Sequence, residues 1–172
     1  MYKRQGGGLL GEQNKSVAIG YGKIVAGAPN HAAGGVSNTG AAYIYDIDGT
    51  NEIKLVASDA ASSNFFGKSV AITSSKIYVG ARNTSNGGAV YSYDHDGTNE
   101  LKITASDSVA GDAFGWSVAT NGSKLVVGAP FGNGGRGAVY TFDLDGSNQS
   151  KITTDPNIDS LGISVDLSLI HI

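Results

Sequence analysis

Pairs of aspartates two residues apart occur three times in this sequence of 172 residues, each within the pattern Asp-x-Asp-Gly. Carboxylates at this spacing could bind a hard cation such as calcium, and the pattern resembles the start of an EF-hand loop. An EF-hand also needs glutamate at its twelfth position, where this chain has Ala57, Ala105 and Thr154. We therefore interpret the pattern as a hairpin turn, with weak calcium binding as the alternative. The six carboxylates are those of Asp46, Asp48, Asp94, Asp96, Asp143 and Asp145.

No other set of residues has the spacing of a catalytic or cofactor site. The histidines, His31, His95 and His171, lack metal-ligand spacing, and there is no cysteine. Neither a Gly-x-Ser-x-Gly elbow nor a phosphate-binding glycine motif is present. We expect a chain that is not an enzyme and has no cofactor.

Composition narrows the classes of fold and partner. The formal net charge is −3 without a basic stripe, so nucleic acid is not expected as a partner. No apolar run approaches the ~20 residues that cross a membrane, so insertion into a membrane is not expected either. The 26 glycines disfavour a helical bundle, because Gly costs about 1 kcal/mol in a helix interior. Short strands joined by tight turns remain.

The sequence is built from a repeated unit. The dipeptide Ser-Val recurs at Ser16, Ser69, Ser117 and Ser164, at intervals of 53, 48 and 47 residues. Gly-Ala, an aromatic pair and Asp-x-Asp-Gly follow in the same order in each of the first three units. The aromatic pairs are Tyr43/Tyr45, Tyr91/Tyr93 and Tyr140/Phe142.

Each unit predicts four short strands; in the first unit they are residues 16–19, residues 23–26, the alternating segment around Tyr43 and Tyr45, and residues 52–57. A four-stranded antiparallel unit of this length is typical of a β-propeller blade, with a sandwich or another solenoid as the alternative. The aromatic pairs would pack between blades. The predicted fold class is all-β, an open partial ring because propellers typically need about 4 to 8 blades. Its blades span residues 6–64, 65–113 and 114–160, and a fourth blade starts at residues 161–166.

The two ends differ in composition from the repeats. Residues 1–5 (MYKRQ) and 167–172 (LSLIHI) match the translation of one sequencing-library adapter, read in its two directions. We expect both tails to be foreign to the fold and residues 6–166 to be an internal fragment, with natural termini as the alternative. Missing blades of the parent chain, or self-association, would then cover the apolar faces of the open ring.

The repeated motifs resemble FG-GAP repeats, the blades of the integrin alpha-chain propeller and of many microbial surface proteins. The resemblance covers nearly all of residues 10–166, although the second unit has Arg82 where the motif has Pro. It implies a binding or adhesion module that is extracellular or on the cell surface. The motifs that carry it begin at Phe66-Gly67, Phe114-Gly115, Gly27-Ala28-Pro29 and Gly128-Ala129-Pro130.

The calcium loop of integrin-type repeats lies between the first and second strands of a blade. Here these turns are residues 20–22, 73–75 and 121–123, which contain no carboxylate. A calcium ion binds six to eight oxygens, many of them from carboxylates. We therefore do not carry the family's calcium site over to this chain.

Specificity on a repeated scaffold usually resides in variable loops, which here join the second strand to the third and one blade to the next. On these loops we select Arg82, Phe131 and Arg136 as ligand contacts, because Arg and aromatic residues are enriched at binding hot spots. We expect Trp116 to pack near the axis of the ring rather than to bind a sugar. The expected function is recognition of a protein or glycan.

Two other functions stay open. A propeller-type carbohydrate-active enzyme would need clustered carboxylates on the same loops. A structural spacer would need no ligand contacts at all. The carboxylates available to an enzyme are Asp59, Asp107, Asp112 and Asp155.

Overall fold

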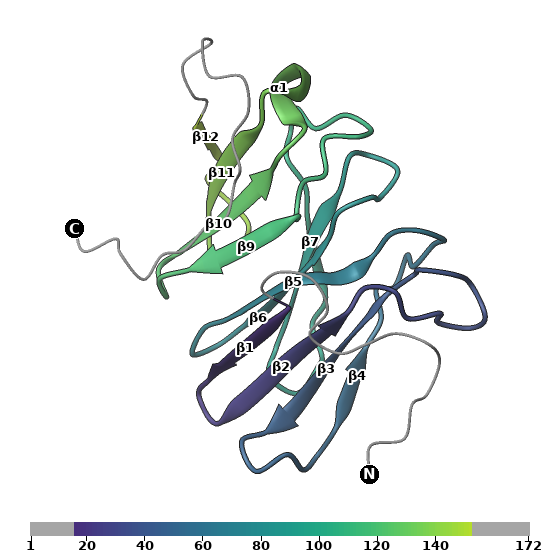
Figure 1. The fold of residues 1–172 in the computed structure, drawn as a ribbon. Coiled ribbons are helices and arrows are strands. Elements are labelled where there is room, and N and C mark those ends of the chain that lie inside the picture. The colour runs from purple at the N-terminus through teal and green to yellow at the C-terminus, as the bar shows by residue number, and fades with distance from the viewer. Residues whose placement is uncertain (1–15, 153–172) are drawn as a thin grey trace.

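The computed structural model describes residues 16–152, which form three four-stranded antiparallel sheets (Figure 1). Within each sheet, strands that follow one another in the chain pair as neighbours. The first sheet contains β1 (Val17–Gly20), β2 (Lys23–Ala28), β3 (Ala41–Asp46) and β4 (Ile53–Leu55). The second contains β5 (Phe66–Ile72), β6 (Ile77–Ala81), β7 (Ala89–Tyr93) and β8 (Leu101–Ile103). The third contains β9 (Ser117–Thr120), β10 (Lys124–Ala129), β11 (Ala138–Asp143) and β12 (Ser150–Ile152).

The predicted strands are present, with differences at their ends. The fourth strand of each sheet has three residues, fewer than the sequence predicts. In the first two sheets the reason is a turn, since the carbonyls of Ala57 and Ala105 accept hydrogen bonds from Ala60 and Ser108. The short element α1 (Gly132–Gly135) contains left-handed residues, so it is a glycine-rich turn in a loop rather than a regular helix.

Side chains from neighbouring sheets form the core. Phe66 packs edge-on against Tyr91 and Tyr93, and Phe114 packs in the same way against Tyr140 and Phe142. These aromatic side chains share one apolar cluster with residues of the preceding sheet, such as Ile44 and Val25 for the first group. The aromatic pairs of the second and third units therefore pack between sheets, as the sequence predicted. Apolar area buried between the sheets stabilises their stacking.

Glycines of the two repeated motifs allow the backbones of neighbouring sheets to meet. A Cβ added to Gly27 or Gly80 would clash with the carbonyl oxygen of Gly67 or Gly115 in the next sheet. The buried Ser69 hydroxyl also donates to the Gly115 carbonyl, at 2.9 Å. The Phe-Gly of one repeat thus packs on the Gly-Ala of the repeat before it. This explains why the two motifs occur together.

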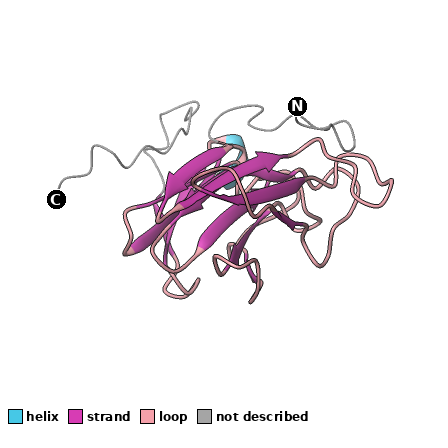
Figure 2. Cartoon of the chain, turned by 90° about the horizontal axis from the view of Figure 1, so that it is seen from below, coloured by secondary structure: helices cyan, strands magenta, loops and turns pink. Residues whose placement is uncertain are grey.

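The loops that connect the strands lie at the two opposite ends of the sheets (Figure 2). One end carries the loops that join second strands to third strands and one sheet to the next, and we call this end the loop face. Backbone hydrogen bonds join its loops, for example from Phe65 to Asn38 and from Phe131 to Asp112. The described loop face comprises residues 30–39, 58–64, 82–86, 106–113 and 131–136.

Several predictions from the sequence lie outside the described residues. These are the two adapter-like tails, the start of a fourth blade at residues 161–166, and the loop that contains Asp155. Within residues 16–152, no helix is long and apolar enough to cross a membrane.

Candidate ligand-binding site on the loop face

The candidate site lies where the second and third sheets meet at the loop face. Lys68 belongs to β5, Phe65 precedes that strand, and Arg82 directly follows β6. From the third sheet, Trp116 directly precedes β9, and Phe131 lies two residues beyond β10. Two strand ends of each sheet therefore supply the site. We call these five residues the basic–aromatic cluster.

Cation–π contacts hold the basic–aromatic cluster together. The Lys68 ammonium lies 4.5 Å from the centroid of the Trp116 ring, and the Arg82 guanidinium carbon lies 4.9 Å from the same ring. The Arg82 guanidinium also lies 4.2 Å from the Phe65 ring. Phe131 meets Trp116 edge to face, with ring centroids 5.9 Å apart. Each cation–π contact contributes about 0.5–2 kcal/mol, so the rings fix the positions of both charges.

The two cations of this cluster lie close together and are partly desolvated. Lys68 is only 4% exposed, and Arg82 is half-buried. Burial, and next the positive charge of Arg82, hold the pKa of Lys68 below its usual value. Burial also lowers the pKa of Arg82, although a guanidinium stays charged at any physiological pH. Among the ion pairs of residues 16–152, none uses either side chain.

The structure brings together two of the three contacts selected from the sequence. Arg82 and Phe131 meet through Trp116, while Arg136 follows the glycine-rich turn and is exposed, with no described contact to the cluster. Trp116, which we expected near the axis of the ring, has two cations and an aromatic edge as its neighbours. Sequence reasoning missed Lys68, although it stands in the same motif position, Phe-Gly-x-Ser, as Trp116. That equivalence was the available signal.

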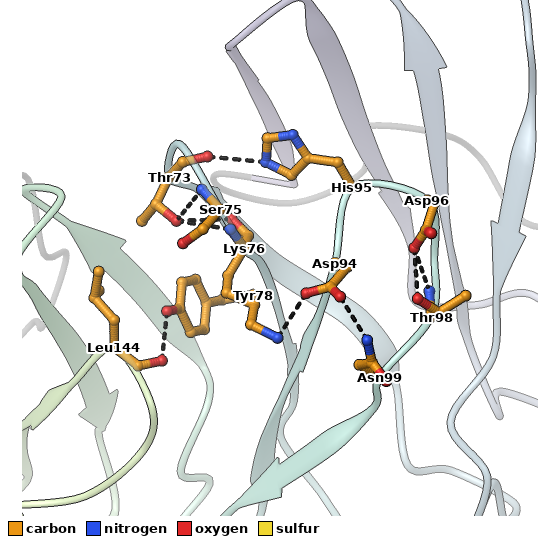
Figure 3. A network of polar contacts seen from close by, with 10 residues as sticks. All are labelled: Thr73, Ser75, Lys76, Tyr78, Asp94, His95, Asp96, Thr98, Asn99 and Leu144. Carbon is orange, nitrogen blue, oxygen red and sulfur yellow. Dashed lines mark hydrogen bonds and ion pairs between the residues drawn. The ribbon is translucent and has the colours of Figure 1, made fainter.

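The Asp-x-Asp-Gly segments form the hairpin turns expected from the sequence, at the end opposite the loop face. Figure 3 shows the turn of the second sheet. In the second sheet, Lys76 pairs with Asp94 at 2.6 Å, and Asn99 donates to the other oxygen of that carboxylate. Asp96 accepts hydrogen bonds from the backbone and hydroxyl of Thr98. The same arrangement occurs at Asp46 and Asp48 with Lys23, Asn51 and Thr50, and at Asp143 and Asp145 with Lys124, Asn148 and Ser147.

These contacts bear on calcium binding. The hydrogen bond from Lys76 is the main reason that the pKa of Asp94 lies below its usual value, and a lysine plays the same part at Asp46 and Asp143. Within residues 16–152, no three His, Asp or Glu side chains gather as they would around a metal ion. In the second blade, the family's calcium position corresponds to the turn between β5 and β6. There the Thr73 hydroxyl closes the turn by accepting a hydrogen bond from the Lys76 backbone N–H. The residues at the family's calcium position therefore do not fit the ion.

Two of the four carboxylates that an enzymatic function could use connect neighbouring blades. Asp59 accepts hydrogen bonds from Tyr91 at 2.6 Å and from Lys102 at 2.5 Å. Burial alone would raise the pKa of Asp59, but these hydrogen bonds outweigh it and keep that pKa below its usual value. A general acid near neutral pH needs a raised pKa, so Asp59 is poorly suited to that role.

Asp107 repeats this arrangement one sheet further on, with Lys151 at 2.6 Å and Tyr140 at 3.0 Å. The hydrogen bond from Lys151 is the main reason that its pKa is lowered. Asp112 is buried, and its carboxylate accepts from the Val109 backbone. Asp155 lies outside the described residues. The described carboxylates of the loop face thus hold loops and sheets in place.

Comparisons with known proteins agree with this architecture. The crystal structure of a nidogen–laminin complex matches with a TM-score of 0.54 and 12% identity, over 78% of this chain and 45% of that chain. The tricorn protease matches with a TM-score of 0.51 and 22% identity, over 87% of this chain and 13% of that chain. The chain thus spans less than half the length of either, and identities this low carry information about the fold alone. No curated protein sequence matches.

A family comparison uses the sequence itself. The FG-GAP repeat matches residues 50–93 and again residues 98–142. Each matched segment contains the fourth strand of one sheet and the first three strands of the next, so the matched unit spans the junction at which the Phe-Gly and Gly-Ala motifs pack. The two segments together cover more than half of the chain. The chain therefore belongs to the FG-GAP repeat family, and its three sheets are blades of a β-propeller.

Proposed function

We propose that this chain is part of a non-catalytic recognition or adhesion module that binds a protein ligand through its loop face. The single observation that carries this proposal is the basic–aromatic cluster, which two blades assemble at that face. The first and second sheets also stack on one another, and residues 16–152 form no such cluster at their junction. Its presence at one junction therefore favours a role in recognition.

The composition of the basic–aromatic cluster resembles that of a binding hot spot. Arg and Trp are the residue types that most often dominate the energetics of protein interfaces. Phe131 is 53% exposed beside them, so a large apolar side chain is offered to solvent next to two cations. A ligand that covers Phe131 would bury apolar area and approach the positive charges at the same time.

The comparisons supply general support for a protein ligand. The matched nidogen–laminin structure is a complex between proteins, and FG-GAP propellers are a family in which binding is a common role. The same family resemblance supports our proposal of a location outside the cell or on its surface. A glycan is the second class of ligand that the test below includes.

The test is binding of the purified 172-residue chain to an array of purified extracellular proteins and to a glycan array. We expect a protein on the array to retain the wild-type chain, and Arg82→Ala and Phe131→Ala to weaken that binding at least 10-fold. Val109→Ser is a matched control, because Val109 is also an exposed apolar residue of the loop face, at 63%, but lies outside the cluster.

Three results would contradict the proposal. Binding that survives both cluster substitutions would place the recognition surface elsewhere. Binding to glycans only would overturn the protein ligand. Retention by nothing on either array at micromolar concentration would favour the spacer function.

A further inference from the structure

The ammonium group of Lys68 differs from those of the other described lysines. Five of the seven lysines in residues 16–152 pair with an aspartate, and Lys54 contacts a ring nitrogen of His31. Within the same part of the chain, the Lys68 ammonium lies over the face of the Trp116 ring and takes part in no side-chain hydrogen bond or ion pair. It is nevertheless the most buried of them, at 4% exposure. Burial of a charge without an opposite charge is costly, so this group is poised to gain from an anion.

Arg82 adds a second positive charge next to Lys68. Both cations lie over the Trp116 ring, and their mutual repulsion contributes to the lowered pKa of Lys68. An anion between them would relieve that repulsion and would replace lost hydration. The aromatic rings already hold both groups in place, so little side-chain entropy would be lost on binding.

The repeat shows that the fold does not require an arginine at position 82. At the junction between the first two blades, Pro29 occupies the position of Arg82, and Asn83 occupies the position of Phe131. Arg82 is thus a departure from the repeated motif, placed where it meets the equally unrepeated Trp116. A scaffold role would not explain why both departures fall at one contact.

We propose that Lys68 and Arg82 form a receptor for the carboxylate of an acidic protein segment, with Phe131 accepting an apolar side chain next to that carboxylate. This inference rests on the proposed function and names the ligand chemistry. A guanidinium and an ammonium both donate to carboxylate oxygens, and Arg can do so with two parallel bonds. The apolar neighbour follows from the exposure of Phe131, which adjoins the cations through Trp116.

Other anionic partners fit less well. A nucleic acid needs several basic side chains in a row, and the net charge of this chain is −3. An acidic sugar would use the face of Trp116 for stacking, but Lys68 and Arg82 lie against that ring. A peptide carboxylate needs only the two cations and an apolar neighbour, which is what the basic–aromatic cluster presents.

The experiment uses the fluorescence of Trp116, the single Trp, as the reporter. The 172-residue chain is titrated with a blocked peptide that contains leucine followed by aspartate, and with the same peptide carrying asparagine in place of aspartate. We expect a saturable change with the aspartate peptide and at least 10-fold weaker binding of the asparagine peptide. Lys68→Met, which keeps the apolar stem, and Arg82→Gln should each weaken the aspartate peptide at least 10-fold.

The controls separate a lost charge from a lost fold. Lys68→Arg keeps the positive charge and should bind the aspartate peptide within about 3-fold of the wild-type affinity. The circular dichroism spectra of all variants should match that of the wild-type chain. Equal binding of both peptides, or no effect of Lys68→Met, overturns the inference. Tighter binding of a sulfated heparin disaccharide than of the aspartate peptide overturns it in favour of an acidic glycan.

The inference and the proposed function can fail separately. Suppose that a protein on the array binds through Arg82 and Phe131, but Lys68→Met leaves that binding unchanged; the carboxylate receptor is then wrong and the proposed function stands. If the aspartate peptide binds as expected but no arrayed protein does, the receptor stands and the proposed function is contradicted. If both tests fail, the carboxylate receptor and the proposed function are both wrong.

Discussion

The contact between Gly80 and Gly115 offers a direct test of how neighbouring blades are joined. Gly80 lies in β6 with an ordinary backbone conformation that any L-residue can adopt, so only space restricts what can stand there. A Cβ at Gly80 would come under 3.0 Å from both the Gly115 carbonyl oxygen and the Ser69 hydroxyl. Comfortable contact needs about 3.5 Å, so Gly80→Ala must push the backbone of β9's preceding turn away from β6.

The expected loss of stability follows from these contacts. Forcing extra volume into a packed site costs about 1–3 kcal/mol, and loss of the Ser69 hydrogen bond to Gly115 adds about 1 kcal/mol. The reduced entropy of the unfolded chain offsets about 0.4–1 kcal/mol of this. We therefore expect Gly80→Ala to lower the free energy of unfolding by about 2 kcal/mol. A domain has only about 5–15 kcal/mol in total, so this loss is large.

Gly20→Ala provides the matched control. Gly20 ends β1, its φ is also not positive, and an added Cβ would meet only the Ile72 methyl group at 3.3 Å. We expect this variant to stay within about 0.5 kcal/mol of the wild-type chain. Urea unfolding followed by circular dichroism and by Trp116 fluorescence measures both variants. A Gly80→Ala loss below 1 kcal/mol, or an equal loss for Gly20→Ala, would refute the reasoning.

Two further predictions concern the contacts between blades. Asp107→Asn should lower the free energy of unfolding by about 1 kcal/mol, because it weakens the ion pair with Lys151 and the charge-assisted hydrogen bond from Tyr140 at a half-exposed site. Urea unfolding measures this loss. An unchanged stability would contradict the role of Asp107 as a bridge between blades. Burial raises the pKa of Tyr78 to about 12, and its hydroxyl donates to the Leu144 carbonyl at 2.7 Å. The folded chain thus holds this proton more tightly than the unfolded chain, so the associated stability is intact below pH 10 and falls by about 1.4 kcal/mol per pH unit between pH 10 and 12. Tyr78→Phe should lower stability by about 1 kcal/mol at pH 8 and should lose less stability than the wild-type chain between pH 10 and 11; parallel urea curves for both proteins would contradict it.

The fold was predictable because each unit repeats both its strands and its contacts. Glycine turns, alternating aromatics and a fixed order of motifs point to one four-stranded sheet, and three copies support the same interpretation. The ends of the fourth strands were harder to predict, since Ala57 and Ala105 continue the β-type sequence but begin a turn. Local sequence does not show which carbonyl a turn will use.

The candidate site was predictable only in part, for a reason of geometry. Arg82 and Phe131 stood out as loop residues of hot-spot type, but nothing in the local sequence shows that a tryptophan lies between them. Arg136 had the same appearance and lies apart from the cluster. Lys68 was missed because a lysine within a strand motif is usually exposed, whereas here the neighbouring blade covers it.

The basic–aromatic cluster depends on the stacking of two blades rather than on either blade alone. Lys68 and Arg82 belong to one sheet, and Trp116 and Phe131 belong to the next. The backbone contact of Gly80 with Gly115 lies one residue from Trp116, so the same motif that joins the blades also sets the distance between the cations and the ring. It follows that Gly80→Ala should disturb the cluster as well as the stability of the fold. In this chain the repeated motif builds the scaffold, and departures from it at positions 82, 116 and 131 supply three of the five side chains of the basic–aromatic cluster.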